Sequence, residues 1–111
     1  MSDLDGEVEG LRDISPQASL HLDGGVPCVL LPQTHLARPP GVLVMDTVLC
    51  PRGLGGYVTR LLLGQRISEK GNLNWQQVML LGRAWHTWSW QQISPDQPWI
   101  SIFAEHARVL R

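Results

Sequence analysis

Alternating apolar and polar residues predict a series of strands in the first half of the chain. Residues 18–22 alternate and lead into an Asp-Gly-Gly triplet at 23–25, a combination typical of a hairpin turn. Apolar runs at 26–31, 42–49 and 57–63 predict further strands. We therefore expect three or four antiparallel strands that follow one another as a meander.

Helical periodicity is confined to the two ends of the chain. Between 99 and 110, apolar side chains recur at intervals of three and four, directly after a proline, which predicts a helix. Residues 2–13 predict a shorter helix, weakened by two glycines that each cost about 1 kcal/mol of helix propensity. Residues 74–81 are ambiguous between a short helix and an irregular segment. The order predicts one α+β domain over 1–111, with a short N-terminal helix and the sheet packed against the C-terminal helix.

Composition excludes several classes of partner and site. The 111 residues carry a net charge of −1, and the nine basic residues form no run, so no nucleic-acid footprint is expected. No stretch reaches the length of a membrane span, and no signal segment is recognisable at the start. Two distant cysteines and four histidines without ligand spacing predict neither a metal site nor a cofactor. We expect a cytoplasmic protein with reduced thiols.

Tryptophan is concentrated in one segment. Four of the five tryptophans lie between Trp75 and Trp90. We expect Trp75, Trp85 and Trp99 to fill the space between the sheet and the final helix, because each can bury roughly 150–250 Å². One of Trp88 and Trp90 is expected to remain exposed and to contact a partner.

The sequence of this segment is also specific. Residues 81–89 read Leu-Gly-Arg-Ala-Trp-His-Thr-Trp-Ser. They resemble the Leu-Gly-Arg-x-Trp-x-x-Trp-Ser signature of the prokaryotic E2 family E, part of the ubiquitin-conjugating enzyme-like superfamily. Weaker similarities lie at 26–31, 38–49 and 51–54. The resemblance covers the chain from about residue 26 onward.

The resemblance implies a fold and a function. It implies the ubiquitin-conjugating fold and a role in a bacterial ubiquitin-like conjugation pathway, with an E1-like adenylating enzyme and a ubiquitin-like modifier as partners. Ser89 stands where the acceptor cysteine of that fold would be, so the modifier would be carried as an ester. Two departures favour an inactive adaptor that only binds the E1-like enzyme or the modifier. No His-Pro-Asn precedes the site, and Trp90-Gln91 replaces the Arg-His that tends to follow it.

Activation of Ser89 needs neighbouring groups, since a serine hydroxyl is a weak nucleophile at neutral pH. His86 lies three residues upstream and could take the proton, and Asp96 could orient or replace it. Asn72 or Asn74 could donate to a developing oxyanion, although loop capping is the simpler role for both.

Each candidate also has a purely structural interpretation. Ser89 would then only turn the chain between buried tryptophans, and His86 would bond a backbone carbonyl. Cys50 is the rival acceptor, because a reactive thiol needs an electropositive setting and Arg52 is nearby. Cys28 is predicted to be a small buried hydrophobe. A plain structural subunit of another complex is the third interpretation of the chain.

Overall fold

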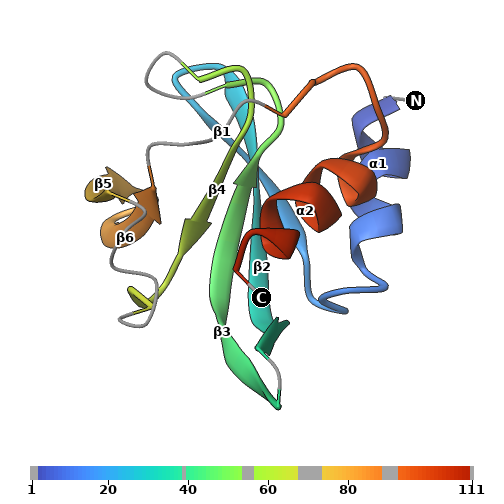
Figure 1. Cartoon of the computed structure of the whole chain (residues 1–111). Coiled ribbons are helices and arrows are strands. Elements are labelled where there is room, and N and C mark those ends of the chain that lie inside the picture. The colour runs from blue at the N-terminus through green and yellow to red at the C-terminus, as the bar shows by residue number, and fades with distance from the viewer. Residues whose placement is uncertain (1–2, 39, 54–56, 68–73, 89–92, 111) are drawn as a thin grey trace.

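The fold consists of an antiparallel sheet with helices on one face (Figure 1). The computed structural model describes residues 3–38, 40–53, 57–67, 74–88 and 93–110. In these ranges the elements are α1 Asp3–Leu11, β1 Ser19–Asp23, β2 Val26–Arg38, β3 Gly41–Cys50, β4 Arg60–Leu63, β5 Trp75–Leu80, β6 Arg83–Trp88 and α2 Trp99–Arg108.

The strand order across the sheet is β1-β2-β3-β4-β6-β5. Strands β1 to β4 are neighbours in sequence order, and β6 lies between β4 and β5. The prediction of a ubiquitin-conjugating fold, with three or four strands against a C-terminal helix, is therefore wrong. The described part of the chain forms a six-stranded antiparallel sheet with two helices.

The error arose at the β5–β6 hairpin, where 74–81 was predicted as a short helix or an irregular segment. Strand β5 contains Gln76 and Gln77 in succession, which breaks the apolar alternation that marks a half-buried strand. Its turn is also unusual. Leu81 has φ 51° and Gly82 has φ 76°, as a two-residue type I′ turn requires, but leucine rarely adopts this conformation.

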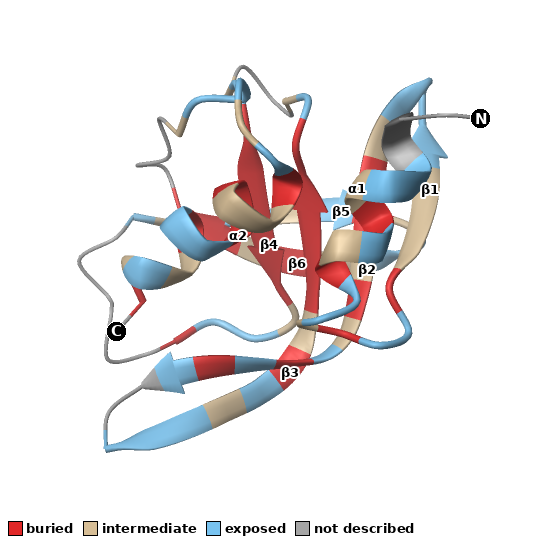
Figure 2. Cartoon of the chain, turned by 90° about the vertical axis from the view of Figure 1, so that its right-hand side faces the viewer, coloured by how far each residue is buried: buried red, intermediate tan, exposed pale blue. Residues whose placement is uncertain are grey.

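One face of the sheet carries the larger core, which we call the helix-side core. It joins alternate strand residues to α1 and α2, and Figure 2 shows buried residues in red on the strands behind the helices and on turns of both helices. Its members are Val8, Leu11, Ala18, Val29, Leu31, Leu36, Met45, Leu49, Leu61, Leu63, Ile67, Trp88, Trp99, Ile102, Phe103 and Leu110.

The opposite face carries a smaller group, the far-side cluster. Its members are Cys28, Val48, Cys50, Leu62, Leu80 and Trp85. Leu80 and Trp85 come from the β5–β6 hairpin, which turns away from the plane of β1–β4 (Figure 1) and so covers part of this face. Leu63 pairs with His86 in the ladder between β4 and β6, and the Thr87 hydroxyl donates to the Leu61 backbone oxygen at 2.8 Å.

The two helices are linked to each other at the start of α2. The backbone N–H of Trp99 donates to the Glu7 carboxylate at 3.2 Å. Pro98 offers no capping side chain, so Glu7 of α1 satisfies an N–H that α2 cannot satisfy internally. Neither described helix has the length and apolar character needed to cross a membrane.

Strands β2 and β3 form a long ribbon whose distal end projects from the body (Figure 2). Their register shifts between Leu31 and Thr34, where Gln33 adopts φ 53°. The N–H of Gln33 donates to Asp46 at 3.0 Å, and Arg83 of β6 donates to the other Asp46 oxygen at 3.1 Å. This carboxylate therefore ties the bulge of β2 to the β5–β6 hairpin.

Candidate functional site

The motif at 81–88 builds the β5–β6 hairpin. Leu81 and Gly82 form its turn, and the Arg83 guanidinium lies 4.1 Å from the centre of the Trp85 ring. The Trp85 indole N–H donates to the backbone oxygen of Leu80 at 2.9 Å. The spacing of this motif therefore has a folding explanation that needs no catalytic chemistry.

The two tryptophans of this motif lie on opposite faces of the sheet. Trp85 belongs to the far-side cluster, and Trp88 belongs to the helix-side core. The Trp88 ring packs edge-on against Trp75 at 5.7 Å and against His106 at 6.3 Å. Trp88 is fully buried, so its side chain is not available for the partner contact expected at Trp88 or Trp90. Trp90 lies outside the described residues.

The predicted catalytic residues are spread over the chain. Ser89 and Asn72 lie outside the described residues. His86 lies on β6, opposite Leu63 and Gln77, and is partly buried. Asp96 is exposed in the turn before α2.

None of these groups is joined to another where the chain is described. No hydrogen bond connects His86 with Asp96 within residues 74–88 and 93–110. The backbone N–H of Asp96 donates to the Ser94 hydroxyl at 3.1 Å. Asn74 is exposed at φ 54°, a conformation that asparagine tolerates in loops. The assignment of Ser89 as acceptor, with His86 or Asp96 assisting, therefore stays a prediction, because Ser89 lies outside the described residues.

Two hydrogen bonds of Thr59 connect the backbone at Ile93 with the side chain of His106 on α2. The Thr59 hydroxyl donates to the backbone oxygen of Ile93 at 2.8 Å and lies 3.0 Å from Nε2 of His106. Because the hydroxyl hydrogen goes to Ile93, Nε2 of His106 must carry the other hydrogen. Burial lowers the pKa of His106 to about 4, so this imidazole is neutral at physiological pH.

The sequence contained a signal for this buried histidine. His106 follows Trp99 by seven residues and Phe103 by three, on the apolar stripe of α2. A histidine on the apolar stripe of a helix is typical of a buried imidazole and not of a metal ligand set. Among the described residues, no group of three His, Cys, Asp or Glu side chains could hold a metal ion.

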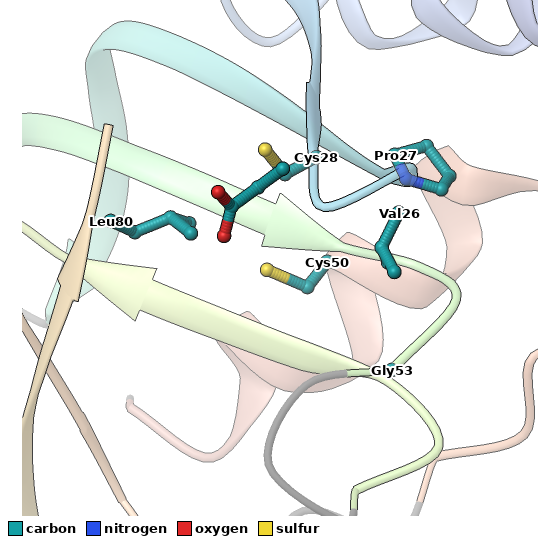
Figure 3. A pocket seen from close by; sticks show the side chains of 7 residues that line it. Val26, Pro27, Cys28, Cys50, Gly53 and Leu80 are labelled. Carbon is teal, nitrogen blue, oxygen red and sulfur yellow. The ribbon is translucent and has the colours of Figure 1, made fainter.

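Both cysteines line a cavity of about 180 Å³ on the far side of the sheet. Figure 3 shows Cys28 and Cys50 on neighbouring strands, with Leu80 across the space from them. Burial raises the pKa of the Cys50 thiol to about 12; Cys28 and Asp23 add to the rise, and Arg60 opposes it. A thiol in this setting is a poor thioester acceptor, which weakens the rival assignment to Cys50.

The outer edge of β5 is open in the part of the chain that the structure describes, because β5 is the last strand of the sheet. Met79 on this strand is 68% exposed. It shares a face with Gln77, and across the hairpin with Ala84 and His86. Strand edges of this kind recruit extended peptides.

Comparison of the chain with protein-family models, curated proteins and solved structures finds no match.

Proposed function

We propose that the chain is a non-catalytic binding component of a ubiquitin-like conjugation pathway, and that it holds the extended C-terminal tail of the modifier on the edge of β5. The resemblance at 81–89 supplies the pathway. The observation that carries the proposal is the placement of this motif: it folds the hairpin whose outer strand, β5, is one of the two edge strands of the sheet in the described ranges.

Strand polarity supports the docking of a C-terminal tail. A tail added antiparallel to β5 runs in the same direction as β6, so its carboxyl end lies at the Trp75 end of β5. Trp75 pairs with Trp88, the last residue of β6, directly before Ser89 in the sequence. Two strand spacings, roughly 10 Å, separate the added tail from β6. An extended segment of about three residues covers roughly 10 Å, so a residue shortly after the end of β6 is within reach of the carboxyl end of the tail.

The surface around the edge suits a tail with alternating apolar and polar residues. Met79 offers an exposed apolar contact on one face of β5, beside the polar Gln77 and His86. On the other face, Val78 is partly buried against the far-side cluster. Backbone hydrogen bonds would supply affinity, and Met79 would select the side chains.

Isotope-labelled chain titrated with candidate ubiquitin-like proteins from the source organism tests the docking. We expect amide shifts confined to Trp75–Leu80 and the adjacent turn, and no shifts with the same proteins lacking their C-terminal tails. Binding without tail dependence, or shifts confined to the β2–β3 ribbon, would contradict the proposal.

A matched pair of variants localises the surface. Met79→Asp should weaken binding by about 10-fold or more in calorimetry, because it places a charge at the proposed contact. Val44→Asp is the control, since Val44 is also exposed, at 52%, but lies on the β2–β3 ribbon. Equal losses from the two variants would sink the assignment to β5.

A second candidate function is transfer of the modifier to Ser89. It is favoured by the same polarity, which directs the tail toward the end of β6 that Ser89 follows. The modifier's activated carbonyl would form an ester with the Ser89 oxygen, and the E1-like enzyme would be released. His86 or Asp96 would have to accept the hydroxyl proton.

Intact mass after incubation with the E1-like enzyme, modifier and ATP separates the two functions. A hydroxylamine-sensitive adduct that is lost in Ser89→Ala and kept in Cys50→Ala supports transfer. Tail-dependent binding without any adduct supports the adaptor. An adduct lost only in Cys50→Ala would overturn the role of Ser89.

A further inference from the structure

Cys28 and Cys50 occupy directly opposed positions on neighbouring antiparallel strands. Val29 pairs with Leu49 and Leu30 with Val48, so one further step in the same register places Cys28 opposite Cys50. Both residues belong to the far-side cluster, so both side chains lie on one face of the sheet. Opposed residues in an antiparallel ladder have Cα atoms about 4.5–5.5 Å apart. A disulfide needs about 4.4–6.8 Å.

The cavity beside the two thiols opens toward the surface. Cys28 and Cys50 line it together with Val26 and Asp23, which are both exposed residues of the β1–β2 hairpin. Figure 3 shows the two sulfur atoms on the cavity side of their strands. A small oxidant can therefore reach the sulfurs without separating β2 from β3.

The two cysteines are the middle members of a row of four paired positions that crosses β1, β2, β3 and β4. His21 pairs with Cys28, and Cys50 pairs with Arg60. Arg60 is 3% exposed, and its guanidinium donates to the Gln76 side chain at 2.7 Å and stacks on the Tyr57 ring at 4.1 Å.

Arg60 has no ion-pair partner within the described ranges, and its Nε has no hydrogen-bond partner. A buried guanidinium without a carboxylate favours an anion beside it. Cys50 lies opposite Arg60 on the neighbouring strand, and Arg60 opposes the rise that burial imposes on the pKa of the Cys50 thiol. The guanidinium therefore favours the Cys50 thiolate once it forms.

We propose that Cys28 and Cys50 form a dithiol–disulfide pair, oxidised by a small-molecule disulfide or a peroxide. With a disulfide oxidant, the Cys50 thiolate attacks one oxidant sulfur and releases the first thiolate. The Cys28 thiolate then attacks Cys50 Sγ of the mixed disulfide and releases the second thiolate. The protein loses two electrons and two protons, and the oxidant becomes two thiols. This site is independent of the proposed docking on β5.

The bond would lock β2 to β3 at the edge of the cavity. It closes the loop between residues 28 and 50, so it restricts the unfolded chain and raises the melting temperature, by roughly 10 °C. Burial raises the pKa of both thiols. We therefore expect a reaction that is slow at neutral pH and faster at mildly alkaline pH.

Oxidation of the intact chain by glutathione disulfide tests the proposal. The chain has only two cysteines, so the loss of two hydrogen atoms in a monomer, measured by intact mass, identifies this bond. Since two molecules of reduced glutathione are released, the midpoint is the value of [GSH]²/[GSSG] at which half of the chain is oxidised. It should be at least about 10-fold higher for the folded chain than for the chain in denaturant, because the folded sheet holds the sulfurs together.

Cys28→Ala and Cys50→Ala serve as controls. Each should stop at a glutathione adduct on the remaining cysteine, while circular dichroism reports whether the variant is folded. A folded wild-type chain that keeps a stable glutathione adduct would overturn the proposal. So would a folded chain that is harder to oxidise than the unfolded one.

Discussion

The two faces of the sheet are built from the same strands and differ in what they bury. The helix-side core is closed by α1 and α2. It also holds a polar contact between Thr59 and His106, in which the Thr59 hydroxyl donates its hydrogen to the backbone oxygen of Ile93. The far-side cluster has six members, covered in part by the β5–β6 hairpin, and borders a cavity and the buried Arg60. The helix side therefore carries most of the fold's stability, and the far side carries its reactive groups.

The difference is set residue by residue along the strands. On β4, Leu61 and Leu63 point toward the helices, and Arg60 and Leu62 point away from them. The consecutive leucines Leu61 and Leu62 thus lie on opposite faces of the sheet, one in the larger core and one in the smaller cluster. Predictions that compare neighbouring residues test this division directly.

The largest expected effect is on the free energy of unfolding in a pair of leucine variants. Leu61→Ala should cost about 4 kcal/mol, because both helices pack over that face and prevent it from collapsing. Leu62→Ala, equally buried, should cost about 2–3 kcal/mol. Leu62 belongs to the smaller cluster, and other members of that cluster line a cavity that leaves them room to relax. Urea unfolding of both variants measures the difference. An equal or larger cost for Leu62→Ala would break the comparison.

The next effect is a pH dependence that belongs to the helix side. The pKa of His106 is about 4 in the folded chain, where the ring is buried, and 6.5 for an exposed histidine, as in the unfolded chain. Between pH 4 and pH 6.5 the unfolded chain therefore binds more protons than the folded chain. Stability is therefore complete above pH 6.5 and falls on acidification, by about 3 kcal/mol at pH 4.

Denaturant unfolding at several pH values measures this slope. His106→Gln keeps a side-chain donor for Thr59 and removes the titrating ring, so its stability should vary less over the same window. Thr59→Val is the second control, because it loses the hydroxyl and leaves the imidazole in place. A slope unchanged in His106→Gln would assign the acid sensitivity to other groups.

The smallest expected effect concerns the link between the bulge of β2 and the hairpin. The Asp46 and Arg83 side chains are 39% and 46% exposed, so solvent screens their ion pair. Asp46→Asn keeps an acceptor for the Gln33 N–H and removes the charge. We expect a loss below about 1 kcal/mol, measured by urea unfolding. A greater loss would show that the far-side hairpin depends on this charge.

Much of the meander and both helices could be predicted from the sequence. Strands β1 to β3 follow clear alternation or apolar runs, and α2 follows its apolar stripe. Strand β5 could not be predicted, because Gln76 and Gln77 hide its alternation. The positive φ of Leu81 is also absent from the usual turn signals. That one hairpin changed the fold class.

The candidate site was less predictable than the fold. The motif at 81–89 carried the resemblance, and its two tryptophans lie three residues apart on a strand, which places Trp85 and Trp88 on opposite faces of the sheet. The thiol pair was hidden in a different way. Cys28 and Cys50 are each eleven positions from Pro39, which lies in the predicted loop between their strands. Only the pairing of these two strands places the cysteines opposite each other.

The contact between Glu7 and the backbone of Trp99 joins residues 92 positions apart. Helix α1 precedes all the described strands, so it leaves the ribosome before its partner α2, which follows the whole sheet. During translation α1 must therefore wait with its apolar face uncovered, and the closing of the helix layer becomes a late, long-range step. The same separation makes this layer a natural place for chaperones to act on the nascent chain.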